Sequence, residues 1–308
     1  MSENIIYKLT EKNTKIQTEL TNTRRLLKEA TRSSLQNKSI ISELIKIKAP
    51  GKVAFSPSKI NTNLNTPIFM WSDWHVEGVV DLKNTHGLNE FSPKIAKERI
   101  NILIKETKNY IKNISYKYNE AIIWLGGDFI EGWIHPELEQ TNAMSPIEAT
   151  QFAIDLLNYA IKEVEKSIPK NKKITILCNY GNHSRITMKM QHGNQSKTNF
   201  ESLIYNNLKT SFPKIKFIFS NEIGYYNMKS GGTLRFCHGH QVRSIVAASL
   251  DKWKNNINKY ISADLTILGH YHTMSVPCKD LVINGSIKGF DEYAYGLGLG
   301  FDEPRQGV

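Results

Sequence analysis

Two patterns of apolar residues alternate along the chain from about residue 67 to residue 180. Short apolar runs at 68–71, 121–125 and 174–178 have the length of buried strands, and each ends abruptly in polar residues. Between them, residues 93–118 and 146–167 repeat apolar side chains at roughly helical spacing. Pro146 suits the first turn of the second helix. Strands that alternate with helices in this way predict an α/β fold.

The pattern changes after about residue 214, where short strand-like runs follow one another more closely. One helix is expected among them, at about 243–260. The runs lie near residues 215–219, 224–229, 233–237, 264–268 and 281–284. We therefore expect a second sheet in the C-terminal half of the chain.

The N-terminal residues 1–48 are predicted to form a helical arm. No Gly or Pro precedes Pro50, and Ile and Leu recur at imperfect helical spacing between charged residues. Residues 1–50 contain ten Lys or Arg and five Asp or Glu, a local charge of +5. Such an arm either self-associates or holds nucleic acid, or is a solvated helix docked on the main domain. Residues 49–66, with several Pro, Gly, Asn and Ser, are predicted to link it to a domain at 67–308.

The whole chain is basic, with 40 Lys or Arg against 29 Asp or Glu and a formal charge of +11. This balance favours a polyanionic partner such as nucleic acid, although it also serves solubility alone. No apolar run is long enough to span a bilayer, so we expect a cytoplasmic protein without membrane contact. Asn, Lys and Ile are abundant, which suggests a bacterium or a phage-infected bacterial cell.

Cysteine usage fits the same compartment. The three cysteines, Cys178, Cys237 and Cys278, are far apart and mostly lie in apolar, strand-like runs. This pattern is typical of reduced core thiols rather than of disulfides or a zinc cluster.

Five predicted strands end in residues that bind metals. A single residue separates Asp73 from His75, so their side chains point to the same side of an extended chain. The carboxyl ends of strands are where ligands collect in α/β sheets, which gives such residues a reason to meet. Six of the nine histidines occupy these positions. The other four strand ends carry Asp128; Asn182 and His183; His238 and His240; and His270 and His272.

The chemistry of this set predicts a metal centre. Carboxylates, an amide oxygen and several imidazoles suit divalent Mn, Fe, Zn, Co or Ni better than Ca. The ligands are too many for one tetrahedral ion, and two ions bridged by a carboxylate would use them naturally. We expect two divalent cations, with Mn²⁺ first and Fe, Zn, Co or Ni as alternatives.

The order Asp-x-His, Gly-Asp, Gly-Asn-His, His, Gly-His-x-His resembles the calcineurin-like metallophosphoesterase superfamily. All five signatures of that superfamily occur in order between Asp73 and His272, over about two thirds of the chain. The resemblance implies a four-layer α/β/β/α sandwich with a dinuclear centre between its two sheets. It also implies that two cations activate a bridging hydroxide for attack on a phosphate ester.

The resemblance also implies roles for the metal ligands. Asp128 would bridge both metals. Asp73, His75 and His272 would hold the first metal. Asn182, His238 and His270 would hold the second metal.

Two further histidines receive roles outside the metal shell. His183 would be the proton donor or transition-state stabiliser, whereas His240 would contact the phosphate or support a ligand. Many members place Asp or Glu directly after Gly-Asn-His, where this chain has Ser184 and Arg185. The partner that orients His183 is therefore not identified. The residues after Asp128 also argue against the phosphoprotein-phosphatase subgroup.

The residues that follow the Gly-Asn-His motif bear on the substrate. Arg185 and Lys189 belong to a polar segment, 184–198, that is expected to overhang the metals and grip phosphate. With the basic charge, this favours a nuclease that hydrolyses DNA or RNA, similar to the Mre11/SbcD-type and phage-encoded branches. A phosphomonoesterase or small-nucleotide phosphodiesterase is the main alternative. A non-enzymatic nucleic-acid-binding or assembly factor is the third.

Overall fold

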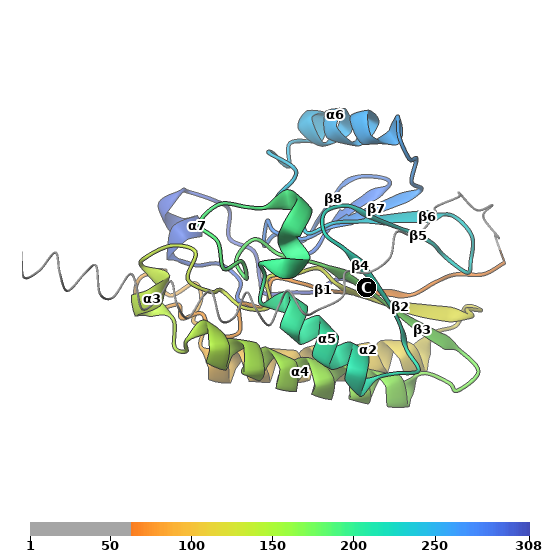
Figure 1. The fold of residues 1–308 in the computed structure, drawn as a ribbon, viewed down its shortest axis with the longest axis horizontal. Coiled ribbons are helices and arrows are strands. Elements are labelled where there is room, and N and C mark those ends of the chain that lie inside the picture. Colours follow the sequence, from red (N-terminus) through yellow and green to blue (C-terminus); the bar gives the residue numbers. More distant parts are fainter. Residues whose placement is uncertain (1–62) are drawn as a thin grey trace, which may run out of the picture. The chain divides into compact units, whose positions relative to one another are not determined.

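The apolar runs of the chain form two β-sheets with helices on their outer sides (Figure 1). The computed structural model describes residues 63–308. The predicted arm at 1–48, the self-association assigned to it and the linker up to residue 62 lie outside this range. Within it, the fold is mixed α/β, as the sequence predicts.

The first sheet contains four parallel strands in the order in which they occur along the chain. These are β1 (Ile68–Trp71), β2 (Glu120–Leu125), β3 (Lys173–Asn179) and β4 (Lys216–Ser220). The register places Met70 beside Trp124, Trp124 beside Leu177 and Leu177 beside Ile218. All four strands therefore end at the same edge of the sheet, as parallel pairing requires.

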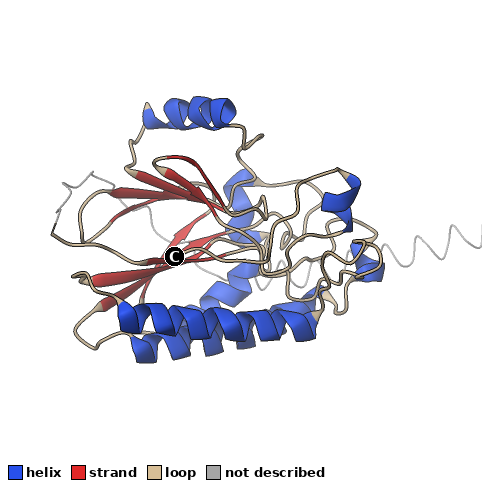
Figure 2. Ribbon diagram, turned by 180° about the vertical axis from the view of Figure 1, so that it is seen from behind, coloured by secondary structure: helices blue, strands red, loops and turns tan. Residues whose placement is uncertain are grey.

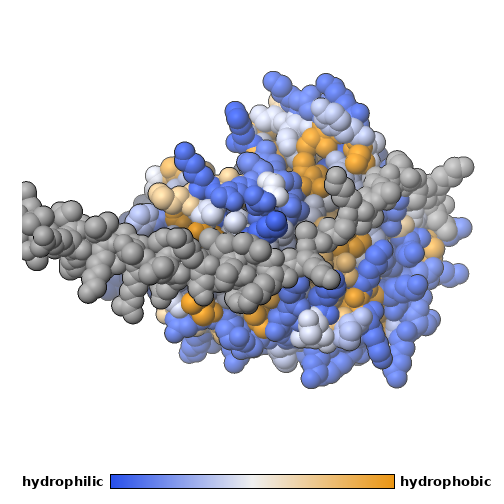
Figure 3. Space-filling view, viewed as in Figure 1, coloured by the Kyte–Doolittle hydropathy of each residue, from blue (hydrophilic) through white to orange (hydrophobic). Residues whose placement is uncertain are grey.

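Three long helices cover one face of this sheet: α2 (Pro93–Asn113), α4 (Pro146–Ser167) and α5 (Glu201–Ser211) (Figures 1 and 2). Ser92 and Ser145 cap α2 and α4, and Glu148 completes a capping box at Ser145. Helix α2 ends at Asn113, five residues earlier than predicted, because Ile114 leaves the helical conformation. Helix α5 was not predicted. The outer rim of these helices is mainly hydrophilic (Figure 3).

The second sheet has the spatial order β5–β6–β7–β9–β8. Its strands are β5 (Gly224–Asn227), β6 (Thr233–Phe236), β7 (Leu265–Leu268), β8 (Ser275–Cys278) and β9 (Leu281–Ile283). The central three strands are parallel and the two edge strands antiparallel. Strand β8 was not predicted. Helix α6 (Ala247–Asn258) lies beyond this sheet, on the side away from the first one (Figure 2).

A shared apolar core joins the two sheets. Trp124 and Leu177 of the first sheet pack in one cluster with Leu234, Phe236 and Ile267 of the second. The indole of Trp124 donates to Asn179 at the end of β3 (2.9 Å). Burial of this apolar surface holds the two sheets together. Because β2, β3, β6 and β7 are all anchored by it, the loops at their carboxyl ends have fixed starting points.

The remaining helical elements are short and lie in the loops around these strand ends. They are α3 (Leu138–Thr141), the 3₁₀ helix η1 (His192–Lys197) and α7 (Glu292–Gly296). Within residues 63–308, no helix is both long and apolar enough to cross a lipid bilayer. Cys178 and Cys237 are buried, Cys278 is partly exposed, and all three are free thiols.

The C-terminal segment reinforces the end of β1. The side chain of Gln306 accepts from the backbone N–H of Ser72 (2.9 Å) and donates to the carbonyl of Ser72 (3.1 Å). It also accepts from the Trp74 indole (3.3 Å) and donates to the carbonyl of Gly285 (2.8 Å). The Gln306 side chain therefore binds both the backbone N–H and the backbone carbonyl of Ser72, the residue that precedes Asp73.

We expect Gln306→Ala to lower the free energy of unfolding by about 2 kcal/mol, because buried backbone groups of Ser72 lose their partner. Denaturant unfolding of the full chain measures this. Gln140→Ala, an exposed change on α3, serves as the control and should be nearly neutral. Equal stability of the two variants would contradict the role assigned to Gln306.

Candidate metal centre

The backbone itself is unusual at the strand ends. Within residues 63–308, six non-glycine residues have positive φ, and five of them are predicted metal ligands. These five are Asp73 (56°), His75 (45°), Asp128 (53°), His270 (73°) and His272 (57°). Left-handed backbone costs about 1 kcal/mol or more for a residue with a Cβ. Strain of this kind gathers at functional sites, where the surrounding structure enforces it.

The first ligand group contains Asp73, His75 and His272, whose donor atoms all lie within 4.8 Å of one another. The Nε2 atoms of His75 and His272 are 3.1 Å apart. His272 Nε2 is 3.6 Å from Asp73 Oδ1. Asp73 and His75 are buried, whereas His272 is partly exposed. The site is thus open on the side of His272.

The second ligand group contains Asp128, His238 and His270, again within 4.8 Å. The Nδ1 of His238 donates to the carbonyl of Gly126 (2.8 Å), which leaves Nε2 to face the centre. This Nε2 lies 2.9 Å from Asp128 Oδ2 and 3.0 Å from Asn182 Oδ1. Three atoms that are natural acceptors therefore converge on one point, where a cation would satisfy all of them.

The charged groups make this site attractive to a cation. Burial opposes a charge on His238, but Asp128 and Asp73 outweigh it and raise its pKa to about 10, so a proton on Nε2 competes with an ion for this position. Burial lowers the pKa of His75 and His270 well below the ordinary value, so both imidazoles are neutral, the form that ligates metals. Burial favours the neutral form of Asp128, yet His238 and His183 hold its pKa well below the ordinary value.

Buried atoms without partners point the same way. His75 Nδ1 and Asp128 Oδ2 are buried and make no hydrogen bond of good geometry. Buried polar atoms are nearly always satisfied, so such atoms need an explanation. The mixed N/O donor set suits divalent transition ions. The residues present therefore fit the metal centre that the sequence predicts.

A glycine explains part of the third motif. A Cβ at Gly181 would overlap the carboxylate of Asp128. Only glycine lets the chain after β3 pass this close to the carboxylate, and Asn182 and His183 follow directly. The Gly in Gly-Asn-His is therefore required by space next to Asp128, rather than by its own backbone angle.

The structure supplies the partner of His183 that the sequence leaves open. The backbone N–H of His183 donates to Asp128 Oδ1 (2.7 Å). Its Nδ1 donates to the carbonyl of Glu131 (3.1 Å), and its ring packs edge-on against His75 (4.9 Å between centroids). A backbone carbonyl thus orients the imidazole, where other sequences with this motif use a carboxylate. Such a partner leaves no signal in the sequence.

Three buried glutamates around the centre were not predicted as part of it. Glu201 accepts from the N–H groups of Phe129 (3.0 Å) and Gly181 (2.7 Å). It also accepts from the hydroxyl of Ser184 (2.9 Å). Burial and the nearby Asp128 raise its pKa to about 7. Glu201 therefore holds the loops after β2 and β3 together, and Ser184 is its partner rather than that of His183.

Glu77 and Glu131 organise the neighbouring loop. Glu77 accepts from the N–H groups of Glu131 (2.9 Å) and Gly132 (2.8 Å). Glu131 forms a buried ion pair with Lys288 (2.8 Å), and Asp291 pairs with the same ammonium (2.9 Å). The position of the Glu131 carbonyl, and with it the orientation of His183, is fixed by these contacts.

The three predicted phosphate-binding residues, Arg185, Lys189 and His240, lie in different surroundings. Arg185 donates to the carbonyls of Asn182, Thr187 and Met188, all within three residues of it along the chain. Lys189 is exposed. The His240 ring lies 5.6 Å from that of His238 and 6.3 Å from that of His270. The structure thus places His240 beside the second ligand group and turns Arg185 toward its own loop.

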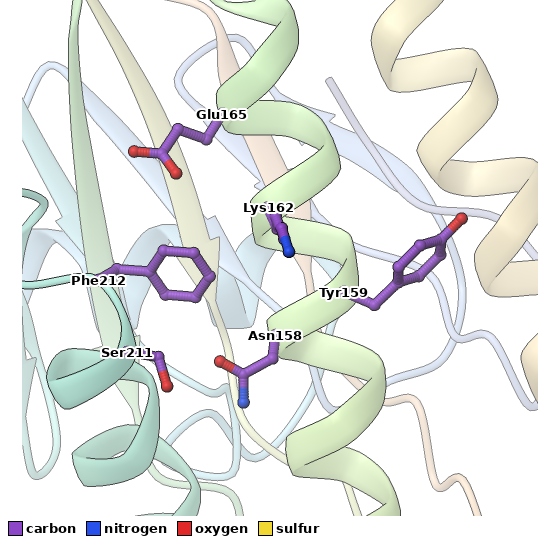
Figure 4. A pocket seen from close by; sticks show the side chains of 6 residues that line it. All are labelled: Asn158, Tyr159, Lys162, Glu165, Ser211 and Phe212. Carbon is purple, nitrogen blue, oxygen red and sulfur yellow. The ribbon is translucent and has the colours of Figure 1, made fainter.

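A hollow of about 590 Å³ lies away from these residues. Figure 4 shows its lining side chains on α4 and at the end of α5. They are Asn158, Tyr159, Lys162, Glu165, Ser211 and Phe212. None of them is a predicted site residue, and the hollow holds no cluster of metal-binding side chains. We assign it no function.

Comparisons with known proteins add little. No protein-family model matches the chain, and no curated protein matches it. Among solved structures, the chain is similar to a single mutant of Vps29 from Entamoeba histolytica, with 18% identity, a TM-score of 0.28, and coverage of 55% of this chain and 76% of that one. It is also similar to the phosphopantetheinyl hydrolase PptH from Mycobacterium tuberculosis, with 7% identity, a TM-score of 0.29, and coverage of 80% and 97%. At such TM-scores these similarities carry no argument about function.

The buried carboxyl of Glu77 makes stability depend on pH. Burial raises its pKa from 4.5 to about 7. The neutral side chain therefore stabilises the fold below about pH 4.5, and this contribution is lost as the pH rises through about 7. In Glu77→Gln the oxygen retains both N–H partners and cannot ionise. We expect the variant to match the wild type near pH 4.5 and to be more stable at pH 8, by up to about 3 kcal/mol.

Urea unfolding in EDTA at several pH values measures this difference without changes in metal binding. Glu98→Gln, an exposed change on α2, is the control and should show no such trend. A Glu77→Gln variant that is less stable than the wild type at pH 8 would contradict the assignment.

Proposed function

We propose that the protein is a metal-dependent phosphodiesterase of the calcineurin-like metallophosphoesterase superfamily and that its substrate is nucleic acid. The observation that carries the proposal is the convergence of two ligand groups at the strand ends, Asp73–His75–His272 and Asp128–His238–His270. These residues belong to the motifs found along the sequence, and their side chains also lie together in space. The two sheets with α2, α4 and α5 on one outer side and α6 on the other support the four-layer sandwich (Figure 1).

A dinuclear centre is part of the proposal. Asp128 lies against His238, and the backbone of Asp128 accepts from His75 N (3.1 Å), so it sits between the two ligand groups. The carboxylates of both Asp128 and Asp73 interact electrostatically with the His238 imidazole. When two divalent cations are bound, they supply a nucleophilic water of lowered pKa and neutralise charge on the phosphate oxygens. Mn²⁺ is the first choice, with Fe, Zn, Co or Ni as alternatives.

The protein's own residues supply the remaining chemistry. His183 is held by Glu131 through Nδ1, so Nε2 is the nitrogen left to carry a proton to the leaving group. The alkoxide that leaves a nucleic-acid backbone is a poor leaving group and gains from such a proton. The buried environment of Asp128 and His75 has a low local dielectric, which strengthens each of these electrostatic interactions.

The choice of nucleic acid as substrate rests on charge and on the segment after His183. The chain carries +11, and Lys189 is exposed on a segment whose base is closed by backbone contacts between Ser184 and Phe200 (2.9 Å) and between Ile186 and Thr198 (2.9 Å). An exposed lysine on a fixed segment beside the strand ends suits contact with phosphates that flank the cleaved bond.

The full chain with Mn²⁺ should cleave bis-p-nitrophenyl phosphate and labelled DNA or RNA, and should cleave p-nitrophenyl phosphate poorly. Asp128→Asn, which tolerates the same backbone conformation, should lose bound metal and at least 100-fold of the rate. Asp155→Asn, an exposed change on α4, is the control. Rapid monoester cleavage with intact nucleic acid would point to a phosphomonoesterase. The absence of cleavage of all substrates would favour a binding or assembly factor.

A second variant tests His183. We expect His183→Ala to retain the metal content of the wild type and to slow nucleic-acid cleavage about 10²–10⁴-fold, the usual contribution of a general acid. The loss should be smaller for bis-p-nitrophenyl phosphate, whose leaving group needs no proton. Metal analysis and kcat on both substrates measure this, with His135→Ala as the exposed control. Full activity of His183→Ala would exclude the assigned role.

A further inference from the structure

A further group of potential ligands lies beside the proposed dinuclear centre and shares no residue with it. His192, Glu222 and His240 each present a donor atom within 4.8 Å of the other two. His192 Nδ1 lies 2.8 Å from Glu222 Oε1, and His240 Nε2 lies 3.5 Å from Glu222 Oε2. The three residues come from η1, from the turn between β4 and β5, and from the loop after β6.

The carboxylate at the middle of this group is held in place from two sides. Gln195 donates to Oε1 of Glu222 (2.5 Å), and Gln241 donates to Oε2 (2.7 Å). Glu222 is half-buried, but the nearby His240 imidazole and hydrogen bonds from Gln241 and His192 outweigh its burial and hold its pKa below the ordinary value. The group therefore contains a fixed negative charge between two imidazoles.

His240 has no other explanation in the structure. Its side chain is only 9% exposed, and neither ring nitrogen makes a hydrogen bond of good geometry. Nε2 is 3.5 Å from the nearest carboxylate oxygen, which is too long for a hydrogen bond but suits two ligands of one ion. Tetrahedral zinc holds His and carboxylate donors at about 2.0–2.2 Å, which places pairs of donors roughly 3.3–3.6 Å apart. The His240–Glu222 pair has this separation, whereas the 2.8 Å between His192 and Glu222 is a hydrogen-bond distance, so this pair would separate slightly on binding an ion.

We propose that His192, Glu222 and His240 bind a third cation, a zinc-type divalent ion, which fixes the segment 184–198 to the ends of β4 and β6. Two histidines and one glutamate form a known donor set for zinc with an open fourth position. His192 is 69% exposed, so an ion reaches the group from solvent. In this proposal His240 is a ligand rather than a direct contact of the phosphate.

The position of this cation gives it a consequence for binding. The His240 ring lies next to those of His238 and His270, so the third ion faces the same space as the proposed second metal. It adds positive charge there and holds the segment that carries Lys189. The inference depends only on these three residues and does not require the proposed reaction.

Zinc content of the full chain tests the inference. The protein is stripped with EDTA, incubated with Zn²⁺, desalted and analysed by mass spectrometry of the metal. We expect Glu222→Gln and His192→Asn each to retain one equivalent of zinc fewer than the wild type. His135→Asn, an exposed histidine outside the group, should match the wild type. His192 is exposed, so its replacement leaves the fold intact.

A second measurement reports on the segment itself. Zn²⁺ should slow tryptic cleavage after Lys189 in the wild type and leave the rate unchanged in Glu222→Gln. Equal zinc content in the wild type and both variants overturns the third site. Asp128→Asn is analysed in parallel. If the wild type binds a single zinc that Glu222→Gln removes and Asp128→Asn retains, the third site stands and the dinuclear proposal fails.

Discussion

The convergence of buried carboxylates and imidazoles at the strand ends is the constraint on which the rest of the structure depends. Asp73, His75, Asp128 and His238 are all fully buried. Burial of even one unpaired carboxylate costs several kcal/mol. Here the cost is offset by pairing among the groups themselves, as between His238 and Asp128, and a cation held by their donor atoms would offset more of it. The surrounding loops hold these carboxylates and imidazoles close enough together for this pairing.

Those loops are held by buried side chains from distant parts of the chain. Gln306 fixes the backbone before Asp73, Glu201 joins the loops that carry Asp128 and His183, and Glu77 fixes the loop that presents the Glu131 carbonyl. None of the three belongs to either ligand group. Each accepts hydrogen bonds from backbone N–H groups that would otherwise be buried without partners. The centre is therefore positioned mainly through the backbone, and its precision depends on glutamates and a glutamine that bind no metal.

The sequence predicted strands β1, β2 and β3, helix α4 and the meeting of seven proposed ligand residues, because each rests on a local pattern. The run near 215–219 was expected in the second sheet, but it forms β4 of the first sheet, beside β3. Apolar runs of strand length and the polar residues that end them are visible in a short window. Helix α5 and strand β8 were missed, since α5 follows a long polar segment and β8 contains only four residues, one of them proline. The contacts of Glu201 and Gln306 were also missed. They join residues 72 and 234 positions apart, and no local pattern encodes such pairs.

The positive φ of the five ligand residues restricts which amino acids these positions accept. Each position is subject to two independent demands: a donor atom for the proposed ion and a backbone that only glycine adopts without strain, with Asn, Asp and His next in tolerance. A β-branched residue fails both demands at once, whereas glycine fails only the first. In a mutational scan scored for folding alone, glycine should therefore be accepted at Asp73, His75 and Asp128 more readily than alanine. Very few amino acids both supply a donor atom and tolerate this backbone, so few substitutions at these positions would preserve the site.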